Sequence, residues 1–173
     1  MRRIAAHWLF DGENILPYPL VDLDDTGRIT GLYSSKQMHK EEAGTEFYSG
    51  MLCPGFINVH THTELAGLQS RSDITTLSGF LSYVVEDRPA LTPSKIHANQ
   101  KNLIAYYSDL GISAYADILN IANLNETDSS VPARRAFYEF IPVSEKRVSE
   151  QMQVFERLKK SGPIHGIALH SPY

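Results

Sequence analysis

Short apolar runs separated by polar turns fill the first third of the chain. The segment Leu20–Asp24, a glycine-containing turn and the segment Arg28–Tyr33 together predict a β-hairpin. Residues 35–46 are charged, show no hydrophobic period and predict a surface connection. The pattern up to residue 51 is therefore typical of β structure.

From residue 52 the pattern changes to alternating strands and helices. Apolar runs of strand length, several of them rich in β-branched or aromatic residues, predict buried strands at 52–60, 112–120, 136–143 and 165–170. Thr92, Pro93 and Gly111 are suited to the N-cap, the first turn and the end of one helix. Ser144 is suited to cap a second helix, whose apolar stripe consists of Val148, Met152, Phe155 and Leu158.

Alternating β and α segments with apolar strands favour a parallel sheet with helices packed outside it. Residues 52–173 hold about four such units. A closed (β/α)8 barrel needs about eight units and roughly 250 residues. The pattern therefore fits either about half of such a barrel or an open, doubly wound sheet of four strands.

Composition excludes several classes of function. The 173 residues carry a net charge of −4 and are 42% hydrophobic, which is typical of a globular protein. No basic cluster interleaves with aromatic residues, so we expect neither a nucleic acid nor a membrane as partner. The N-terminus has no signal-peptide pattern and no run reaches the ~20 apolar residues of a membrane span. Cys53 is the only cysteine, and we expect a cytoplasmic protein.

His60 and His62 stand one residue apart at the end of the first apolar run, in the segment PGFINVHTHTEL. Side chains at i and i+2 of a strand point the same way, so both imidazoles are expected on one face. Active sites of parallel α/β folds lie at the carboxyl ends of the strands. Two imidazoles at this spacing suit Zn(II) or Fe(II), although catalytic zinc normally has three protein ligands.

His170 ends the fourth predicted strand and reaches the same edge, which makes it a candidate third ligand or a substrate contact. Asp117, near the end of the second strand, is interpreted as a residue that caps a loop or lines the pocket.

Two motifs carry a resemblance to a known family. The segment LCPGFINVHTHTEL resembles the first barrel strand of the amidohydrolase superfamily, where a Pro-Gly-Phe-Ile/Val-(Asp/Asn)-x-His-x-His segment supplies two metal ligands. The segment ALHSPY is similar to the fourth-strand His-(Ala/Ser)-Pro-Tyr segment of the deaminase and chlorohydrolase branch. The β-rich lead with its Asp-x-x-Gly-Arg-Ile pattern also suits that branch, whose barrel is accompanied by a small β-sandwich built from both chain ends.

The resemblance implies a fold for the whole chain. It is an α/β fold, the N-terminal part of a (β/α)8 TIM-type barrel of about four βα units, preceded by a small β-sandwich segment. Residues 1–51 would form the N-terminal β segment, part of a composite β-sandwich. Residues 52–173 would form the first half of a metal-dependent hydrolase barrel.

The resemblance also implies roles for single residues. His60 and His62 would bind one divalent metal, with Zn(II) ahead of Fe(II), and His170 would contact substrate. Glu64 would face the pocket from the first loop; the alternative is a helix-start carboxylate favoured by the helix dipole. The binuclear branches place a bridging lysine on the fourth strand, where this sequence has His-Ser-Pro-Tyr, and this favours a mononuclear site.

The implied activity is hydrolytic deamination of a nucleobase-like or other amine-bearing ring by a metal-bound hydroxide. In the family the remaining ligands and the general acid and base come from the fifth to eighth strands, so no catalytic residue is assigned within residues 1–173. We therefore expect an incomplete, inactive N-terminal portion of a hydrolase acting on carbon–nitrogen bonds. Alternatives are a chlorohydrolase or N-acyl hydrolase of the same superfamily, and a non-catalytic α/β module.

The expected partners follow from the same reading. They are a small-molecule substrate and, because a half barrel exposes two sheet edges, either further copies of the chain or a complementing C-terminal half.

Overall fold

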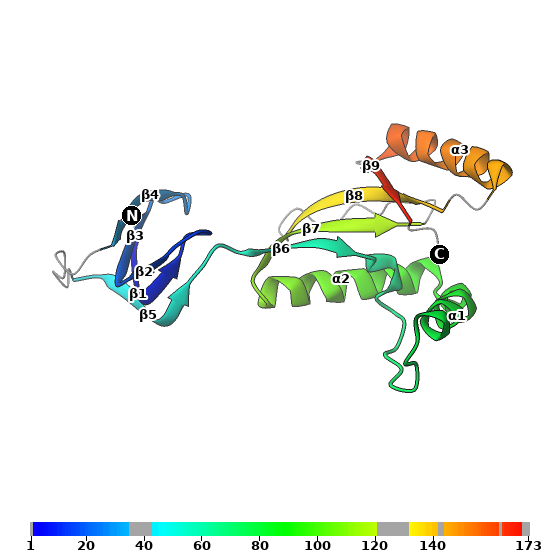
Figure 1. The fold of residues 1–173 in the computed structure, drawn as a ribbon. Helices are drawn as coiled ribbons and strands as arrows, with labels where there is room; N and C mark the ends of the chain where they lie inside the picture. Colours follow the sequence, from blue (N-terminus) through cyan, green and yellow to red (C-terminus); the bar gives the residue numbers. More distant parts are fainter. Residues whose placement is uncertain (1, 35–42, 121–131, 142–143, 163, 171–173) are drawn as a thin grey trace. The chain divides into compact units, whose positions relative to one another are not determined.

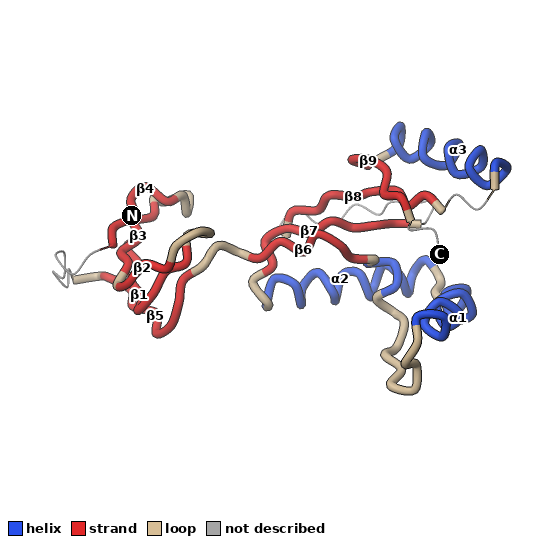
Figure 2. Tube along the Cα trace, in the orientation of Figure 1, coloured by secondary structure: helices blue, strands red, loops and turns tan. Residues whose placement is uncertain are grey.

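The computed structural model describes residues 2–34, 43–120, 132–141, 144–162 and 164–170 (Figures 1 and 2). The chain divides into two compact units, Met1–Pro54 and Gly55–Tyr173. In the described part of the chain, no helix has the length and apolar character required to cross a membrane.

The first unit is a five-stranded sheet. Its strands are β1 (Arg2–Phe10), β2 (Ile15–Pro17), β3 (Pro19–Leu23), β4 (Ile29–Ser34) and β5 (Thr45–Leu52). The order is β2-β1-β3-β4, and β5 pairs with β1 in parallel. The antiparallel β3–β4 pair confirms the predicted hairpin, and Gly27 takes the positive φ of +81° that its turn requires. The predicted connection 35–46 is wrong at its end, because residues 45 and 46 belong to β5.

The first unit buries few apolar side chains. Its buried apolar positions among the described residues are Ala6, Leu9, Pro19 and Val21. Arg3 binds the buried carboxylate of Asp22 at 2.6 and 2.9 Å. Large apolar side chains are instead exposed along the strands: Trp8, Phe10, Ile15, Ile29, Leu32, Tyr33, Phe47, Tyr48 and Met51. The sheet therefore presents more apolar surface than a self-contained β unit normally does.

The second unit contains a parallel sheet, as predicted. Its strands are β6 (Phe56–Thr61), β7 (Ile112–Leu119), β8 (Ala133–Phe140) and β9 (Ile164–Leu169). They lie side by side in chain order, β6-β7-β8-β9, and all three pairings are parallel. The helices are α1 (Leu77–Asp87), α2 (Pro93–Asp109) and α3 (Glu145–Ser161), with short 3-10 turns η1 (Thr63–Leu65) and η2 (Arg88–Ala90). Figure 1 shows α2 alongside β6 and β7, and α3 alongside β8 and β9.

The predicted strand 52–60 is wrong as a single element. β5 ends at Leu52 and β6 begins at Phe56, with Cys53, Pro54 and Gly55 between them. Proline cannot donate to a ladder. A Cβ at position 55 would lie 2.7 Å from the Ser113 Cβ, so the chain passes β7 closely at this point.

The helix boundaries at α2 and α3 confirm the predicted caps. The Thr92 hydroxyl accepts from the Lys95 N–H at 3.4 Å, and Gly111 takes a φ of +73° after the helix. The Ser144 hydroxyl accepts from the Arg147 N–H at 3.2 Å. Helix α1 is missing from the prediction, although Leu77, Phe80, Leu81, Val84 and Val85 recur at the spacing of a helical apolar stripe. None of these side chains is buried.

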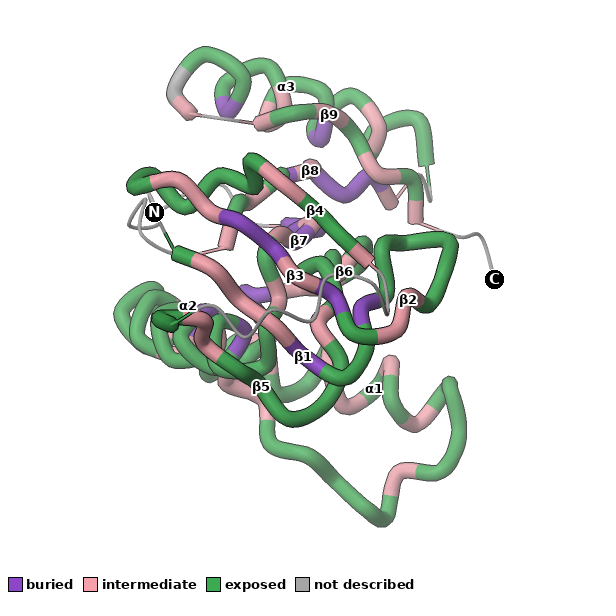
Figure 3. The backbone as a smooth tube through the Cα atoms, turned by 90° about the vertical axis from the view of Figure 1, so that its left-hand side faces the viewer, coloured by how far each residue is buried: buried purple, intermediate pink, exposed green. Residues whose placement is uncertain are grey.

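The predicted apolar stripe of α3 is wrong at Met152, which is 40% exposed. The neighbouring Gln151 is buried instead, where its amide donates to the Glu139 carbonyl at 3.4 Å and accepts from the Ile141 N–H at 3.2 Å. In Figure 3 the buried stretches of this unit's sheet lie on the middle strands β7 and β8.

Candidate active site

The two faces of the parallel sheet carry different chemistry. Helix α2 packs on Tyr115 of β7, and α3 packs on Tyr138 of β8. The register pairs Tyr115 with Arg134, and side chains alternate along each strand, so both helices cover the same face. Ile118 and Glu139 therefore point to the opposite face, which we call the inner face.

His60 and His62 lie on the inner face at the carboxyl end of β6. A bulge between Asn58 and Thr61 changes the register, and both of these side chains hydrogen-bond the Tyr107 hydroxyl of α2, at 3.2 and 2.8 Å. The two histidines consequently point away from α2. Their ring centroids are 5.2 Å apart and the ring planes meet at 68°. The expected shared face is confirmed.

The histidine pair fits one metal ion. Two imidazoles on a single tetrahedral zinc have ring centroids about 5 Å apart, given Zn–N bonds of about 2.0–2.1 Å. Burial lowers the pKa of His62 below its ordinary value, which favours the neutral imidazole that binds metals. Within the described residues, no group of three or more His, Cys, Asp or Glu side chains gathers as a complete site.

Glu139 and His170 stand beside this pair on the inner face. The backbone N–H of His170 donates to the Phe140 carbonyl at 2.8 Å, and this bond fixes the end of β9 against β8. Its Nε2 lies 3.9 Å from Oε1 of Glu139, and the Glu139 charge also acts on His62 by favouring its protonated form. Sequence reasoning missed Glu139. The sequence feature that could have identified it is a carboxylate inside the otherwise apolar run AFYEFIPV, because a charged residue is rarely buried without a partner.

Glu64 is the second residue of η1, the turn that follows the histidines. It is 2% exposed, its Oε1 accepts from the Asn120 N–H at 2.9 Å, and Arg88 Nη2 is 3.5 Å away. Its Oε2 is buried without a hydrogen-bond partner among the described residues. Burial raises the pKa of Glu64 to about 7. The Asn120 N–H after β7 and Arg88 of η2, rather than the dipole of a long helix, thus contact this carboxylate.

Asp117 caps the same turn from the helix-covered face. Its carboxylate accepts from the Thr63 N–H at 3.0 Å and from the Thr63 hydroxyl at 2.7 Å. The loop-capping interpretation of Asp117 is confirmed.

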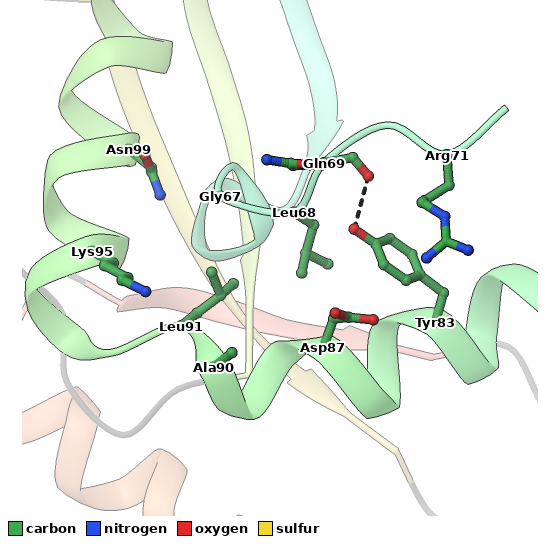
Figure 4. A pocket seen from close by; sticks show the side chains of 10 residues that line it. All are labelled: Gly67, Leu68, Gln69, Arg71, Tyr83, Asp87, Ala90, Leu91, Lys95 and Asn99. Carbon is green, nitrogen blue, oxygen red and sulfur yellow. Dashed lines mark hydrogen bonds between the residues drawn. The ribbon is translucent and has the colours of Figure 1, made fainter.

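A separate cavity of about 490 Å³ lies between the loop after η1, helix α1 and the start of α2 (Figure 4). It is lined by Gly67, Leu68, Gln69, Arg71, Tyr83, Asp87, Ala90, Leu91, Lys95 and Asn99. The Tyr83 hydroxyl donates to the Gln69 carbonyl at 2.8 Å and ties the loop to α1. This cavity does not include the histidine pair, Glu139 or His170.

No protein-family model and no curated protein sequence matches the chain. Solved structures do match it. Aminofutalosine deaminase from Helicobacter pylori aligns over 100% of this chain and 45% of its own, with 22% identity and a TM-score of 0.73. The atrazine chlorohydrolase TrzN from Arthrobacter aurescens TC1, in a zinc complex, aligns over 100% and 48%, with 16% identity and a TM-score of 0.69. 5-Methylcytosine deaminase from Klebsiella pneumoniae aligns over 96% and 36%, with 17% identity and a TM-score of 0.54.

This chain thus spans less than half the length of each of these proteins. These proteins are members of the amidohydrolase superfamily, and what this chain shares with them is the fold. The chain has the α/β fold, with a parallel sheet, of part of these TIM-barrel hydrolases.

Proposed function

We propose that the chain supplies the first half of the active site of a metal-dependent amidohydrolase, a hydrolase of non-peptide carbon–nitrogen bonds. The observation that carries this proposal is the placement of His60 and His62 on the inner face, beside Glu139 and His170, at the carboxyl ends of parallel strands. The proposed reaction is hydrolytic deamination of a nucleobase-like or other amine-bearing ring. Deaminases are two of the three structural neighbours described above.

His60 and His62 would hold one divalent metal, Zn(II) ahead of Fe(II). When bound, the metal would supply the Lewis acidity that lowers the pKa of water and generates a nucleophile near neutral pH. Burial lowers the pKa of His62, which favours the neutral imidazole that binds metals. The general acid and base are assigned to the part of the enzyme that completes the site.

His170 and Glu64 are proposed to act on the substrate side. His170 ends β9 on the inner face, where its ring lies near Glu139 and can donate to, or accept from, a polar ring. Glu64 Oε2 is buried and has no hydrogen-bond partner among the described residues, so it is the atom of this carboxylate left to bond a group that enters the buried space beside it. Its high pKa means that it can donate as a carboxylic acid or accept as a carboxylate near pH 7.

We further propose that the sheet is half of a (β/α)8 barrel and that a complementing C-terminal half covers it. The outer strands expose apolar side chains, with Ile57 and Val59 of β6 at 65% and 76%, and Leu169 of β9 at 78%. Exposed apolar edges of this kind favour strand pairing with another polypeptide. The domain assignment then follows: residues 1–51 belong to a composite β-sandwich, and residues 52–173 to the half barrel.

The histidine pair is tested with cobalt(II) as a spectroscopic substitute for zinc. We expect the 173-residue chain to bind Co²⁺ weakly, because only two ligands are present, and the His60→Ala/His62→Ala double variant to lose at least 10-fold in affinity. The control is His165→Ala, since His165 lies on β9 and accepts from the Ala136 N–H at 3.1 Å. Equal binding by the double variant and the unmodified chain would favour the non-catalytic α/β module.

The exposed edges are tested by light scattering. We expect the chain alone to self-associate, and Val59→Lys with Leu169→Lys to shift it toward monomer, because edge lysines disfavour strand pairing. Val85→Lys is the matched control, since Val85 is 73% exposed but lies on helix α1. A stable monomer of the unmodified chain would contradict the half-barrel proposal.

The activity is tested on the protein as its own cell produces it. Its intact mass, compared with 19.4 kDa for this chain, shows whether a longer polypeptide carries the site. We expect that preparation to release ammonia from amine-bearing rings, whereas the isolated chain should have negligible turnover. Release of chloride or of a carboxylic acid instead would assign the alternative, a chlorohydrolase or N-acyl hydrolase.

A further inference from the structure

A buried polar network lies directly behind the histidine pair, on the helix-covered face of the sheet. Asp117 is completely buried, and its carboxylate accepts from Arg134 Nε at 2.8 Å and Nη2 at 2.6 Å, in addition to both Thr63 donors. The Gln100 amide of α2 donates to the Thr63 hydroxyl at 2.8 Å. The network thus joins β7, β8 and α2 to the turn η1.

This network acts on the backbone of His62 itself. The Thr63 N–H belongs to the peptide that joins His62 to Thr63, and its bond to Asp117 fixes the plane of that peptide. The His62 carbonyl meanwhile accepts from the Leu65 N–H at 3.0 Å, and His62 has φ −119° and ψ 83°, outside the helical region. Rotation at His62 would break both bonds, so the direction of its side chain depends on the network.

The network contains charged groups, whereas neutral hydroxyls are sufficient to cap the helices of this unit. Helices α1, α2 and α3 are each capped by a single neutral hydroxyl, from Thr76, Thr92 and Ser144. At η1 the buried Asp117 carboxylate performs this role for a turn of three residues, and the Arg134 guanidinium pairs with that carboxylate. A buried ion pair is a weak source of stability, but it fixes geometry because each lost bond leaves a charged group unpaired.

We infer that Asp117, Arg134, Thr63 and Gln100 are positioning residues that hold His62 in its metal-binding orientation from behind the sheet. This inference rests on the proposed function, since it assigns the network to the same metal site. None of the four touches the metal or the substrate. Their role corresponds to the outer-shell contacts that orient metal ligands in other proteins.

Two substitutions at Thr63 separate positioning from folding. Thr63→Val keeps the backbone N–H bond and the shape of the side chain but removes the hydroxyl that joins Asp117 to Gln100. Thr63→Ser keeps that hydroxyl. We expect Thr63→Val to weaken Co²⁺ binding about 10-fold and Thr63→Ser to stay within about 2-fold of the unmodified chain. Equal Co²⁺ affinities of the Val and Ser variants would overturn the positioning role.

A second measurement uses the metal-free chain. Asp117→Asn should speed amide hydrogen exchange at Thr63 and Leu65 about 10-fold, because the network then holds the turn less tightly. Asp22→Asn is the matched control, since Asp22 forms a buried arginine pair in the other unit and should leave these amides unchanged. Unchanged exchange at Thr63 in Asp117→Asn would overturn the inference.

The two proposals fail in different ways. Absence of Co²⁺ binding by the unmodified chain would contradict the proposed function, and the exchange measurement alone would then decide whether the network fixes the turn. Binding that is present but insensitive to Thr63→Val would overturn only the positioning role.

Discussion

Replacing Arg134 with methionine is expected to lower the free energy of unfolding of the Gly55–Tyr173 unit by about 3–5 kcal/mol. The Asp117 side chain is 0% exposed and that of Arg134 is 11% exposed. Methionine keeps much of the apolar volume of arginine but removes its charge and donors. The Asp117 carboxylate would then be buried with only the Thr63 donors, and an uncompensated buried charge is strongly destabilising.

Urea unfolding followed by circular dichroism at about 222 nm reports on this unit, because the described helices α1, α2 and α3 all lie within it. Trp8, the only tryptophan, reports on the other unit and should show no change in its midpoint.

Arg71→Met provides the matched control for Arg134→Met. Arg71 contacts Asp73 at 2.9 and 2.7 Å, close to the distances of the buried pair, but their side chains are 51% and 63% exposed. We expect Arg71→Met to lower the free energy of unfolding much less than Arg134→Met does, because solvent screens this exposed pair. If Arg71→Met and Arg134→Met lower the free energy of unfolding by similar amounts, burial does not govern what the Asp117–Arg134 pair contributes to stability.

Glu64→Gln is expected to remove a pH dependence from the stability of the same unit. Burial raises the pKa of Glu64 from 4.5 to about 7, so the folded state holds the proton more tightly than the unfolded state. The contribution of Glu64 to the free energy of unfolding should therefore be fully present below pH 4.5, fall as the pH rises to about 7, and stay constant above that value. A displacement from 4.5 to about 7 corresponds to a loss of about 3 kcal/mol.

The surroundings of Glu64 act in both directions on its pKa. Desolvation is the largest influence, and the negative charges of Asp117 on β7 and Glu139 on β8 add to it. The Asn120 N–H at the end of β7 and Arg88 on η2 oppose it by stabilising the carboxylate.

The measurement is the midpoint of urea unfolding at pH 5 and at pH 8, with chelator present to exclude metal. We expect the unmodified chain to lose stability between these values, and Glu64→Gln to lose much less. Glu150→Gln is the control, because Glu150 lies on α3 with its side chain 51% exposed. If Glu64→Gln and the unmodified chain show the same slope, Glu64 is ionised in the folded protein throughout this range.

Much of the secondary structure depends on local signals and could be read from the sequence. The cap of α2 at Thr92 and the positive φ of Gly111 follow from the side chains at those positions alone. The hairpin of β3 and β4 follows from its turn residues. The alternation of strands and helices predicted the parallel sheet, because parallel neighbours require a crossover.

The shared face of His60 and His62 was also determined locally, since side chains two positions apart on a strand point the same way. The sequence motifs around these histidines and around His170 predicted part of a barrel hydrolase, and the structural comparisons confirm the coarser fold, an α/β fold with a parallel sheet.

Only the tertiary structure decided what surrounds that pair. Asp117 and Arg134 are 17 positions apart, and Thr63 lies 54 positions before Asp117, so no local pattern predicts their contacts. Glu139 meets His170 because β8 and β9 are neighbours in the sheet. The burial of Gln151 in place of Met152 depends likewise on packing partners in another segment, β8 and the residue that follows it. Periodicity and caps are properties of a single segment, whereas burial and charge pairing are decided by which segments meet.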